Sequence, residues 1–147
     1  VNQTLRVFEA MASARGVALR VSFDDGLPVA VLLDTTRFQQ TLMNLVGNAV
    51  KFTRDGRVDV RVGFSDARGA LQVTVEDTGV GISPDNLPYI FDPFFTTKHA
   101  SGEHAGTGLG LTIVHQIIRE HDGDIQVEST EGVGTRVLVN LPAISPE

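Results

Sequence analysis

The chain contains no cysteine, no long apolar stretch and no run of basic residues, and each absence excludes a class of protein. A chain without cysteine has no disulfide framework and no thiolate chemistry. Without a stretch apolar enough to span a membrane, we expect no direct membrane contact. A net charge of −6 with no basic run argues against a nucleic-acid partner. What remains is one packed domain, for which 147 residues with 41% hydrophobic content are sufficient.

Two common glycine motifs are also absent. No lysine follows a glycine anywhere in the sequence, which excludes a P-loop ATPase. The glycine run that starts at Gly106 has its third glycine one residue too early for a dinucleotide fingerprint. A histidine within a helix and one at its end, such as His115 and His121, are more typical of surface packing and a C-terminal cation than of a metal site. We assign no structural metal to them.

Hydrophobic periodicity predicts an α+β domain. We expect helices near Gln3–Ala14, Asp34–Phe52 and Leu109–Glu120, with a short helical or irregular piece within residues 83–89. We expect strands near Val17–Phe23, Ala30–Leu33, Val58–Phe64, Leu71–Glu76, Asp124–Ser129 and Thr135–Leu141. These elements predict a two-layer α/β sandwich in which helices cover one face of a mixed sheet.

Two glycine-rich runs have the pattern of a nucleotide pocket. Asp77-Thr-Gly-Val-Gly81 follows an alternating strand, so its aspartate leaves the sheet edge into a glycine turn. A buried carboxylate in that place can accept a hydrogen bond from an exocyclic amine. Gly106-Thr-Gly-Leu-Gly-Leu111 opens a helical pattern, and the unpaired N–H groups at a helix start favour phosphate. One loop is expected to bind a base and the other the phosphates.

The helix expected at Asp34–Phe52 carries a polar stripe. Asn44 and Asn48 are four residues apart and Lys51 follows three later, so the three side chains share one side of the helix. An amide oxygen is a hard neutral ligand for Mg²⁺ shared with substrate phosphates, and Lys51 supplies a point charge for phosphate oxygens. In isolation, such asparagines more often make only local hydrogen bonds. Beside two glycine loops, the stripe favours a metal and phosphate site.

In these motifs the chain resembles the catalytic and ATP-binding domain of bacterial sensor histidine kinases, within the gyrase, Hsp90, histidine kinase and MutL class of ATPases (the GHKL class, with the Bergerat fold). The family's N box resembles residues 44–53, its G1 box residues 77–81, its F box Phe91-Asp-Pro-Phe-Phe95 and its G2 box residues 106–110. Glu131-Gly-Val-Gly-Thr135 is similar to the glycine turn before the closing strand of such domains. All of these motifs occur in the family's order, and together they span nearly the whole chain.

At the base end of the pocket, the resemblance implies roles for five residues. Asp77 would contact the adenine amino group, and Thr135 would support the same end of the base. Gly79 and Gly81 would form the turn beneath the base. Phe52 would lie against the nucleoside.

At the phosphate end, the resemblance implies ATP and Mg²⁺ as cofactors. Asn48 would be the Mg²⁺ ligand, and Asn44 and Lys51 would lie near the phosphates as the catalytic residues. The phosphate tail would be wrapped by the G2 run, which consists of Gly106, Thr107, Gly108, Leu109 and Gly110. Thr96–Ala105 would be the mobile lid, because its polar composition offers little apolar surface to hold it down.

Two positions depart from the family pattern. Many members that hydrolyse ATP have a glutamate general base where this chain has Asn44, and an amide cannot take a proton from water. The resemblance therefore implies slow hydrolysis and transfer to a protein acceptor, in which positioning and electrostatics supply most of the catalysis. Many histidine kinases also carry an arginine in the lid, whereas here Lys98 is the nearest cation.

The family's acceptor histidine lies in a His-Glu or His-Asp motif on a separate dimerising hairpin, and none of the 4 histidines here fits that place. We expect residues 1–147 to be one domain excised from a longer chain, monomeric and nearly inactive by itself, with a homodimeric parent. The expected partners are the parent's dimerisation domain and a response-regulator receiver domain. The expected location is the cytoplasm, with membrane attachment of the parent left open.

Three functions remain open from the sequence. The first is the ATP-binding half of a histidine kinase, which donates the γ-phosphoryl group to a histidine. The second is a protein-serine kinase of the anti-sigma-factor type, which would act on a soluble partner. The third is a nucleotide-gated docking module that transfers no phosphate. The segment before Asp34, with Gly16-Val-Ala-Leu-Arg20, looks like the start of many histidine-kinase catalytic domains and favours the first.

Overall fold

The structure is a computed structural model, and it describes residues 2–24, 35–53, 55–65, 67–91 and 109–142. The helices are α1 (Asn2–Ala14), α2 (Thr35–Lys51) and α3 (Leu109–Glu120), with a 3₁₀ helix at Leu87–Tyr89. The strands are β1 (Ala18–Phe23), β2 (Arg57–Ser65), β3 (Ala70–Asp77), β4 (Asp124–Thr130) and β5 (Gly134–Pro142). The expected strand Ala30–Leu33 and the expected lid Thr96–Ala105 lie outside the described residues.

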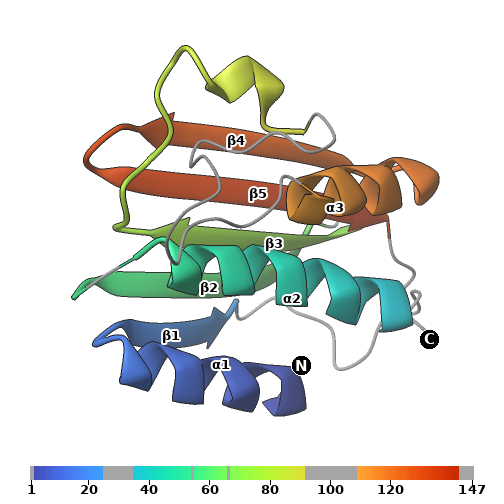
Figure 1. The fold of residues 1–147 in the computed structure, drawn as a ribbon. Coiled ribbons are helices and arrows are strands. Elements are labelled where there is room, and N and C mark those ends of the chain that lie inside the picture. Colours follow the sequence, from blue (N-terminus) through green and yellow to red (C-terminus); the bar gives the residue numbers. More distant parts are fainter. Residues whose placement is uncertain (1, 25–34, 54, 66, 92–108, 143–147) are drawn as a thin grey trace.

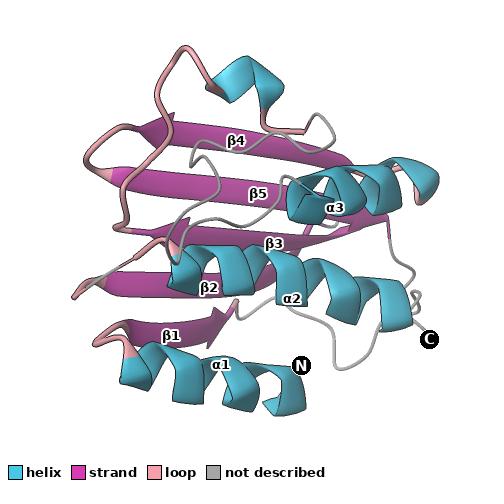
Figure 2. Ribbon diagram, viewed as in Figure 1, coloured by secondary structure: helices cyan, strands magenta, loops and turns pink. Residues whose placement is uncertain are grey.

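The strands form a five-stranded sheet in the order β1-β2-β3-β5-β4. β1 is parallel to β2, and the other neighbouring pairs are antiparallel, so the sheet is mixed. The helices α1, α2 and α3 lie together on one side of this sheet, as Figure 1 shows. The same two layers are visible when the ribbon is coloured by secondary structure (Figure 2). The predicted two-layer sandwich is therefore confirmed.

The core fills the space between the helix layer and one face of the sheet. Along β2 the side chains of Val58, Val60 and Val62 are buried, and they alternate with exposed or half-buried positions, as expected for a strand with one covered face. On α2 the buried side chains recur at helical spacing: Phe38, Leu42, Leu45, Val46, Ala49 and Val50. α3 adds Val114, Ile117 and Ile118, and β5 adds Val137, Val139 and Leu141.

The ends of α1 and α3 are built alike, with a residue at positive φ just after the helix. Gly16 (φ +72°) follows α1, and the N–H of Val17 donates to the Ala12 carbonyl at 2.8 Å. Asp122 (φ +59°) follows α3, and the N–H of Gly123 donates to the Ile118 carbonyl at 2.8 Å. Each is the six-to-one bond of a Schellman motif. Both helices consequently stop at a defined residue and send the chain directly into the sheet.

Candidate functional site

Asp77 is the last residue of β3 and lies opposite Thr135 of β5 in the sheet register. Its Oδ1 accepts a hydrogen bond from the Gly79 N–H at 2.9 Å. Burial raises the pKa of the Asp77 carboxyl above its usual value of 3.8, an effect only partly offset by backbone hydrogen bonds at Gly79 and Thr135. A half-buried acceptor held in one orientation suits recognition of an N–H donor on a ligand.

The backbone of Val80 joins two distant parts of the chain beside Asp77. The Val80 N–H donates to the Phe52 carbonyl at 3.3 Å, just past the end of α2. The Val80 carbonyl accepts from the Gly132 N–H at 2.8 Å, in the turn between β4 and β5. The predicted G1 turn is thus held between the N-box helix and the closing hairpin.

Gly79 and Gly81 stand where this close approach leaves no room for a side chain. A Cβ on Gly79 would collide with the Phe52 carbonyl and would lie 2.9 Å from Asp77 Oδ1. A Cβ on Gly81, whose φ is +71°, would collide with the Thr130 carbonyl. Glycine is required at both positions because backbone, rather than side chain, fills the space next to them.

Ser129 is a part of the site that the sequence analysis missed. Its Oγ accepts from the Ile82 N–H at 2.7 Å, donates to the Gly134 carbonyl at 3.0 Å and lies 2.8 Å from Thr135 Oγ1. Either hydroxyl can be the donor between Ser129 and Thr135, and when Ser129 donates to Gly134, Thr135 is the donor and its Oγ1 remains an acceptor towards a ligand. Ser129 and Thr135 face each other across the predicted hairpin turn. Pairing the two predicted strands about that turn could therefore have placed Ser129 beside Thr135.

The predicted polar stripe lies on α2. Asn44, Asn48 and Lys51 are each half-buried, beside the buried face of the helix. The Lys51 Nζ lies 5.6 Å from the centroid of the Phe52 ring, within the range of a cation–π contact. Through the Phe52 carbonyl, the end of α2 reaches the turn that follows Asp77. The structure therefore brings Lys51 and Phe52 to the Asp77 turn, and it places the two asparagines further back along the same helix.

The G2 end of the predicted site is only partly described. Leu109 and Gly110 open α3, which packs beside α2 on the same face of the sheet (Figure 1). Lys98, Gly106, Thr107 and Gly108 lie outside the described residues.

The first residue of the F box is fixed on α3. The Phe91 carbonyl accepts from Thr112 Oγ1 at 3.0 Å, and the Phe91 ring stacks on His115 with the ring centroids 4.8 Å apart. His115 is half-buried. The F box and the helix after the G2 box are thus in direct contact, which the spacing of the two motifs along the chain does not reveal.

A hollow on the sheet face opposite the helices is not the candidate site. Its lining includes Arg20, Asp24, Asp59, Arg61, Glu76 and Arg136. These charges pair with one another: Arg20 with Asp59 at 3.0 Å, Arg61 with Asp24 at 2.7 Å and Arg136 with Glu76 at 3.9 Å. Charges that already neutralise one another on an exposed face offer little attraction to an ionic ligand.

The Asn48 amide on α2 is the kind of donor that suits a metal shared with a ligand. Among the described residues, no group of three or more His, Cys, Asp or Glu side chains is placed to hold a metal ion. A metal here would depend on amide oxygens such as that of Asn48 together with water and the ligand's own phosphates, which is the coordination that Mg²⁺ accepts.

No helix within the described parts of the chain is long and apolar enough to cross a membrane.

Sensor histidine kinases are among the proteins most similar to this sequence. The chain is 39% identical over 142 residues to the sensor histidine kinase ZraS of Escherichia coli O157:H7, covering 97% of this chain and 30% of that protein. It is 36% identical over 140 residues to the autoinducer 2 sensor kinase/phosphatase LuxQ of Vibrio cholerae, covering 93% of this chain and 16% of that protein. The chain thus spans less than a third of the length of these curated relatives.

Solved structures of histidine kinases share the fold. The catalytic domain of the histidine kinase ThkA, solved without nucleotide, superimposes with a TM-score of 0.80 at 31% identity, over 96% of this chain and 88% of that one. Full-length ShkA in complex with AMPPNP superimposes with a TM-score of 0.86 at 31% identity, over 99% of this chain and 29% of that one.

The family match itself covers residues 33–145, which include both glycine-rich runs, the polar stripe of α2 and the closing hairpin. The chain belongs to the histidine kinase-, DNA gyrase B- and HSP90-like ATPases, in the form found in the catalytic domains of sensor histidine kinases.

Proposed function

We propose that this chain binds Mg-ATP and is the catalytic domain of a sensor histidine kinase, donating the γ-phosphoryl group to a histidine on a separate dimerisation domain. The observation that carries the proposal is the half-buried Asp77 carboxylate, fixed by the Gly79 N–H at the end of β3 and next to the end of α2. Membership of an ATPase family supplies the class of ligand.

Asp77 and Thr135 form the base-binding end in this proposal. The carboxylate accepts a hydrogen bond from the exocyclic amine of adenine, and Thr135 Oγ1 offers a second acceptor on the neighbouring strand. Gly79 and Gly81 let the backbone of the turn approach the flat face of the base. Phe52, half-buried beside Lys51, supplies an apolar ring for the nucleoside.

Lys51 and the asparagines of α2 form the phosphate end. The Lys51 ammonium group meets phosphate oxygens as a point charge, and the Asn48 amide oxygen is the protein ligand for Mg²⁺. When bound, Mg²⁺ would neutralise the charge that develops on the transferred group. Gly106, Thr107, Gly108, Leu109 and Gly110 contribute backbone N–H groups, and Lys98 a further cation.

Asn44 decides between hydrolysis and transfer. An amide has no proton-accepting capacity near neutral pH, so the chain provides no general base at this position for an attacking water. The phosphoryl group is therefore held for a protein acceptor on the dimerisation domain and passed on to a response-regulator receiver domain. Because the donor is ATP, the proposal places this domain in the cytoplasm of a bacterial cell, as part of a homodimeric parent.

Calorimetric titration of this chain with ADP and a non-hydrolysable ATP analogue, each with and without Mg²⁺, tests the pocket. Asp77→Asn is expected to abolish binding while the domain stays folded, because it removes the charged acceptor without changing volume. Asn48→Ala is expected to weaken binding with Mg²⁺ more than binding without it.

Two exposed residues provide matched controls. Asp85→Asn makes the same chemical change on an exposed loop, and Gln39→Ala truncates an exposed amide on α2. Both controls should bind like the parent chain. Unchanged affinity in Asp77→Asn would contradict the pocket assignment.

The acceptor is tested in the full-length parent with γ-labelled ATP. A phosphohistidine is labile in acid and stable in alkali, whereas a phosphoserine behaves in the opposite way. Acid-labile label on the dimerisation domain is expected. Acid-stable label on a separate protein would replace this proposal with the serine-kinase function, and saturable ATP binding without any transfer would replace it with a nucleotide-gated docking module.

A further inference from the structure

We propose that Arg15 is a positioning residue for the nucleotide site: its guanidinium group holds the last turn of α2, and with it Lys51 and Phe52, against the turn that follows Asp77. The inference rests on the proposed function, because it concerns the same site. Arg15 directly follows α1 and lies outside the family's sequence motifs.

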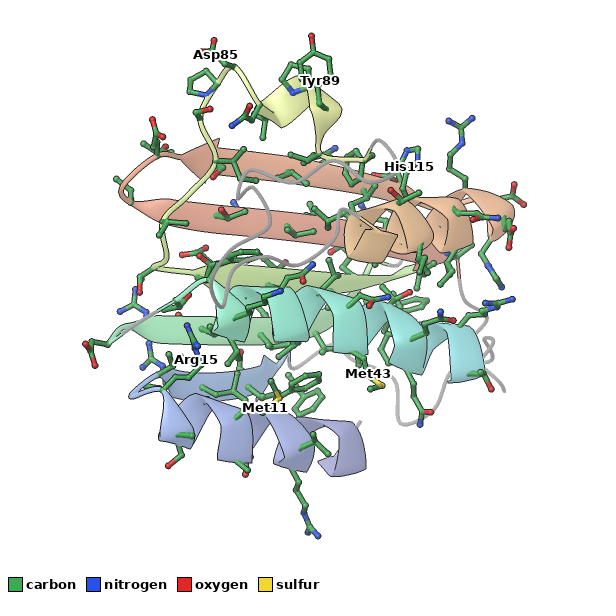
Figure 3. The ribbon with its side chains drawn as sticks, viewed as in Figure 1. Met11, Arg15, Met43, Asp85, Tyr89 and His115 are labelled. Carbon is green, nitrogen blue, oxygen red and sulfur yellow. The ribbon has the colours of Figure 1, made fainter. Side chains whose placement is uncertain are left out.

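The end of α1 directs Arg15 towards α2. Arg15 is the residue before Gly16, and the positive φ of Gly16 closes the Schellman motif that reverses the chain into β1. Figure 3 shows the Arg15 side chain extending from the end of α1 towards the C-terminal end of α2. The Schellman motif that ends α1 thus directs the Arg15 side chain towards the C-terminal end of α2.

Arg15 caps carbonyl groups at the C-terminal end of α2. Its Nε donates to the Val50 carbonyl at 3.1 Å, and its Nη2 donates to the Lys51 carbonyl at 2.7 Å. The Thr53 carbonyl lies 3.5 Å from the same Nη2. The last carbonyls of a helix lack partners within the helix and carry its negative dipole end, so a forked cation is a favourable cap.

The neighbouring carbonyls of this segment are satisfied by other groups. Asn48 O accepts from the Phe52 N–H at 3.0 Å, and Ala49 O accepts from Thr53 Oγ1 at 2.7 Å. Phe52 O accepts from the Val80 N–H at 3.3 Å. Arg15 therefore provides a partner for the Lys51 carbonyl and a second donor to the Val50 carbonyl, which also accepts from the Thr53 N–H at 3.3 Å. These bonds lie directly before Phe52, whose carbonyl is bonded to the Asp77 turn.

Loss of the Arg15 cap should act on one side of the pocket. Lys51 and Asn48 belong to α2, whereas Asp77 belongs to β3 and is held by Gly79. A loosened α2 end changes where the phosphate-binding side chains lie relative to Asp77, and it leaves the base-binding acceptor in place. A triphosphate ligand should therefore lose more affinity than adenosine, which meets the end of α2 only through the Phe52 ring.

The test compares Arg15→Met with the parent chain and with Arg6→Met, a control that removes an exposed arginine from α1, the helix that Arg15 follows. In the nucleotide-free protein, hydrogen exchange of the Val80 amide should be faster in Arg15→Met than in the parent. Exchange of the Val139 amide, in the interior strand β5, reports global stability. Affinity for the ATP analogue should fall by about tenfold, the equivalent of losing one charge-assisted hydrogen bond. Affinity for adenosine should fall by less than about threefold, since Phe52 is its single contact on the loosened end of α2 and Asp77 stays held by Gly79.

Arg15→Lys separates geometry from charge and serves as a second variant that keeps a cation in place. A compact ammonium cannot reproduce the fork, so Val80 exchange should stay faster and affinity for the ATP analogue lower than in the parent. Full affinity in Arg15→Lys together with fast Val80 exchange would mean that only long-range charge matters and would overturn the proposal. Unchanged Val80 exchange in Arg15→Met would overturn it as well.

The two proposals fail in different ways. If the parent chain binds no adenine nucleotide, the proposed function fails, while Val80 exchange in the nucleotide-free protein still decides whether Arg15 holds the end of α2. If the parent binds and Arg15→Met binds the ATP analogue equally well, the positioning role alone is wrong.

Discussion

At the scale of single residues, the chemistry of the site depends on a carboxylate whose surroundings oppose its charge. Burial of Asp77 is the largest influence on its pKa and raises it, while the backbone bonds at Gly79 and Thr135 lower it and nearby Glu76 raises it further. The free domain is thus slightly destabilised by a charge that a ligand needs. Such an exchange of stability for function is common where a polar group must be ready for binding.

Acidification should therefore shift stability and affinity in opposite directions. The raised pKa of Asp77 means that its contribution to stability is fully present below the usual value of 3.8 and is lost as the pH rises through the folded-state pKa. As the pH falls from about 7 to below 3.8, the parent chain should gain stability relative to Asp77→Asn, measured as the difference in free energy of unfolding by urea. Affinity for the ATP analogue should fall over the same window, because the protonated carboxyl is a poorer acceptor.

Measuring the difference between the two proteins removes the titration of the other carboxylates, which both share. A stability difference that is independent of pH in this window would mean that Asp77 titrates as it does in the unfolded chain. That result would contradict the role of burial at this position.

At the scale of elements, the site depends on turns that touch one another through backbone atoms. The turn after β3 approaches both the end of α2 and the β4–β5 turn, and Val80 is bonded to each of them. Gly81 and Gly132 are on the two sides of the second contact and have similar φ values, +71° and +81°. Their surroundings differ, because a Cβ on Gly132 meets nothing within 4 Å whereas a Cβ on Gly81 meets the Thr130 carbonyl.

Alanine at these two glycines should have unequal effects. Gly132→Ala only forces an alanine into a left-handed backbone conformation and should reduce the free energy of unfolding by about 1 kcal/mol. Gly81→Ala adds a collision with backbone and should reduce it by about 2 to 4 kcal/mol. Urea unfolding of the two variants measures the difference. Equal losses of unfolding free energy in the two variants would show that the turn after β3 and the β4–β5 turn can move apart without destabilising the domain.

At the scale of the whole molecule, the sheet has one face packed under the helices and one face covered by paired charges. Val60 and Arg61 are adjacent on β2 and point to opposite faces, with side chains that are buried and 67% exposed respectively. Arg61 pairs with Asp24, which is 39% exposed in its side chain. The stability of the domain should therefore depend on the packed face and very little on the ion pairs.

Truncation of the two neighbours tests this division. Val60→Ala should reduce the free energy of unfolding by about 2 kcal/mol or more, from lost apolar burial and the cavity left behind. Arg61→Ala should reduce it by less than about 1 kcal/mol, because exposed ion pairs are screened by water and salt. Thermal or urea unfolding in low and high salt measures both. A larger loss at Arg61 would show that the charged face is structural.

Most of the described elements, and the chemical character of the candidate site residues, could be predicted from the sequence. Residues that follow one another report local conformation, so the apolar stripe of α2 and the alternation along β2 predicted these elements within one or two residues of their observed bounds. Asp77, Gly79, Gly81 and the polar stripe were likewise readable, because charge, amide chemistry and the need for glycine belong to individual residues. The predicted roles of these residues in binding remain predictions.

Most contacts between distant groups became known only from the packed fold. The sheet places β5 between β3 and β4, which sets Thr135 opposite Asp77. The family resemblance implied that these two residues share one end of the site, but no local pattern in the sequence determines such an order of strands. The same holds for Ser129 beneath Thr135 and for Arg15 on the carbonyls of Val50 and Lys51, 35 and 36 residues further along the chain. A backbone carbonyl has no side-chain signature, so its partner becomes known only when the packing of helices and sheet brings the two atoms together.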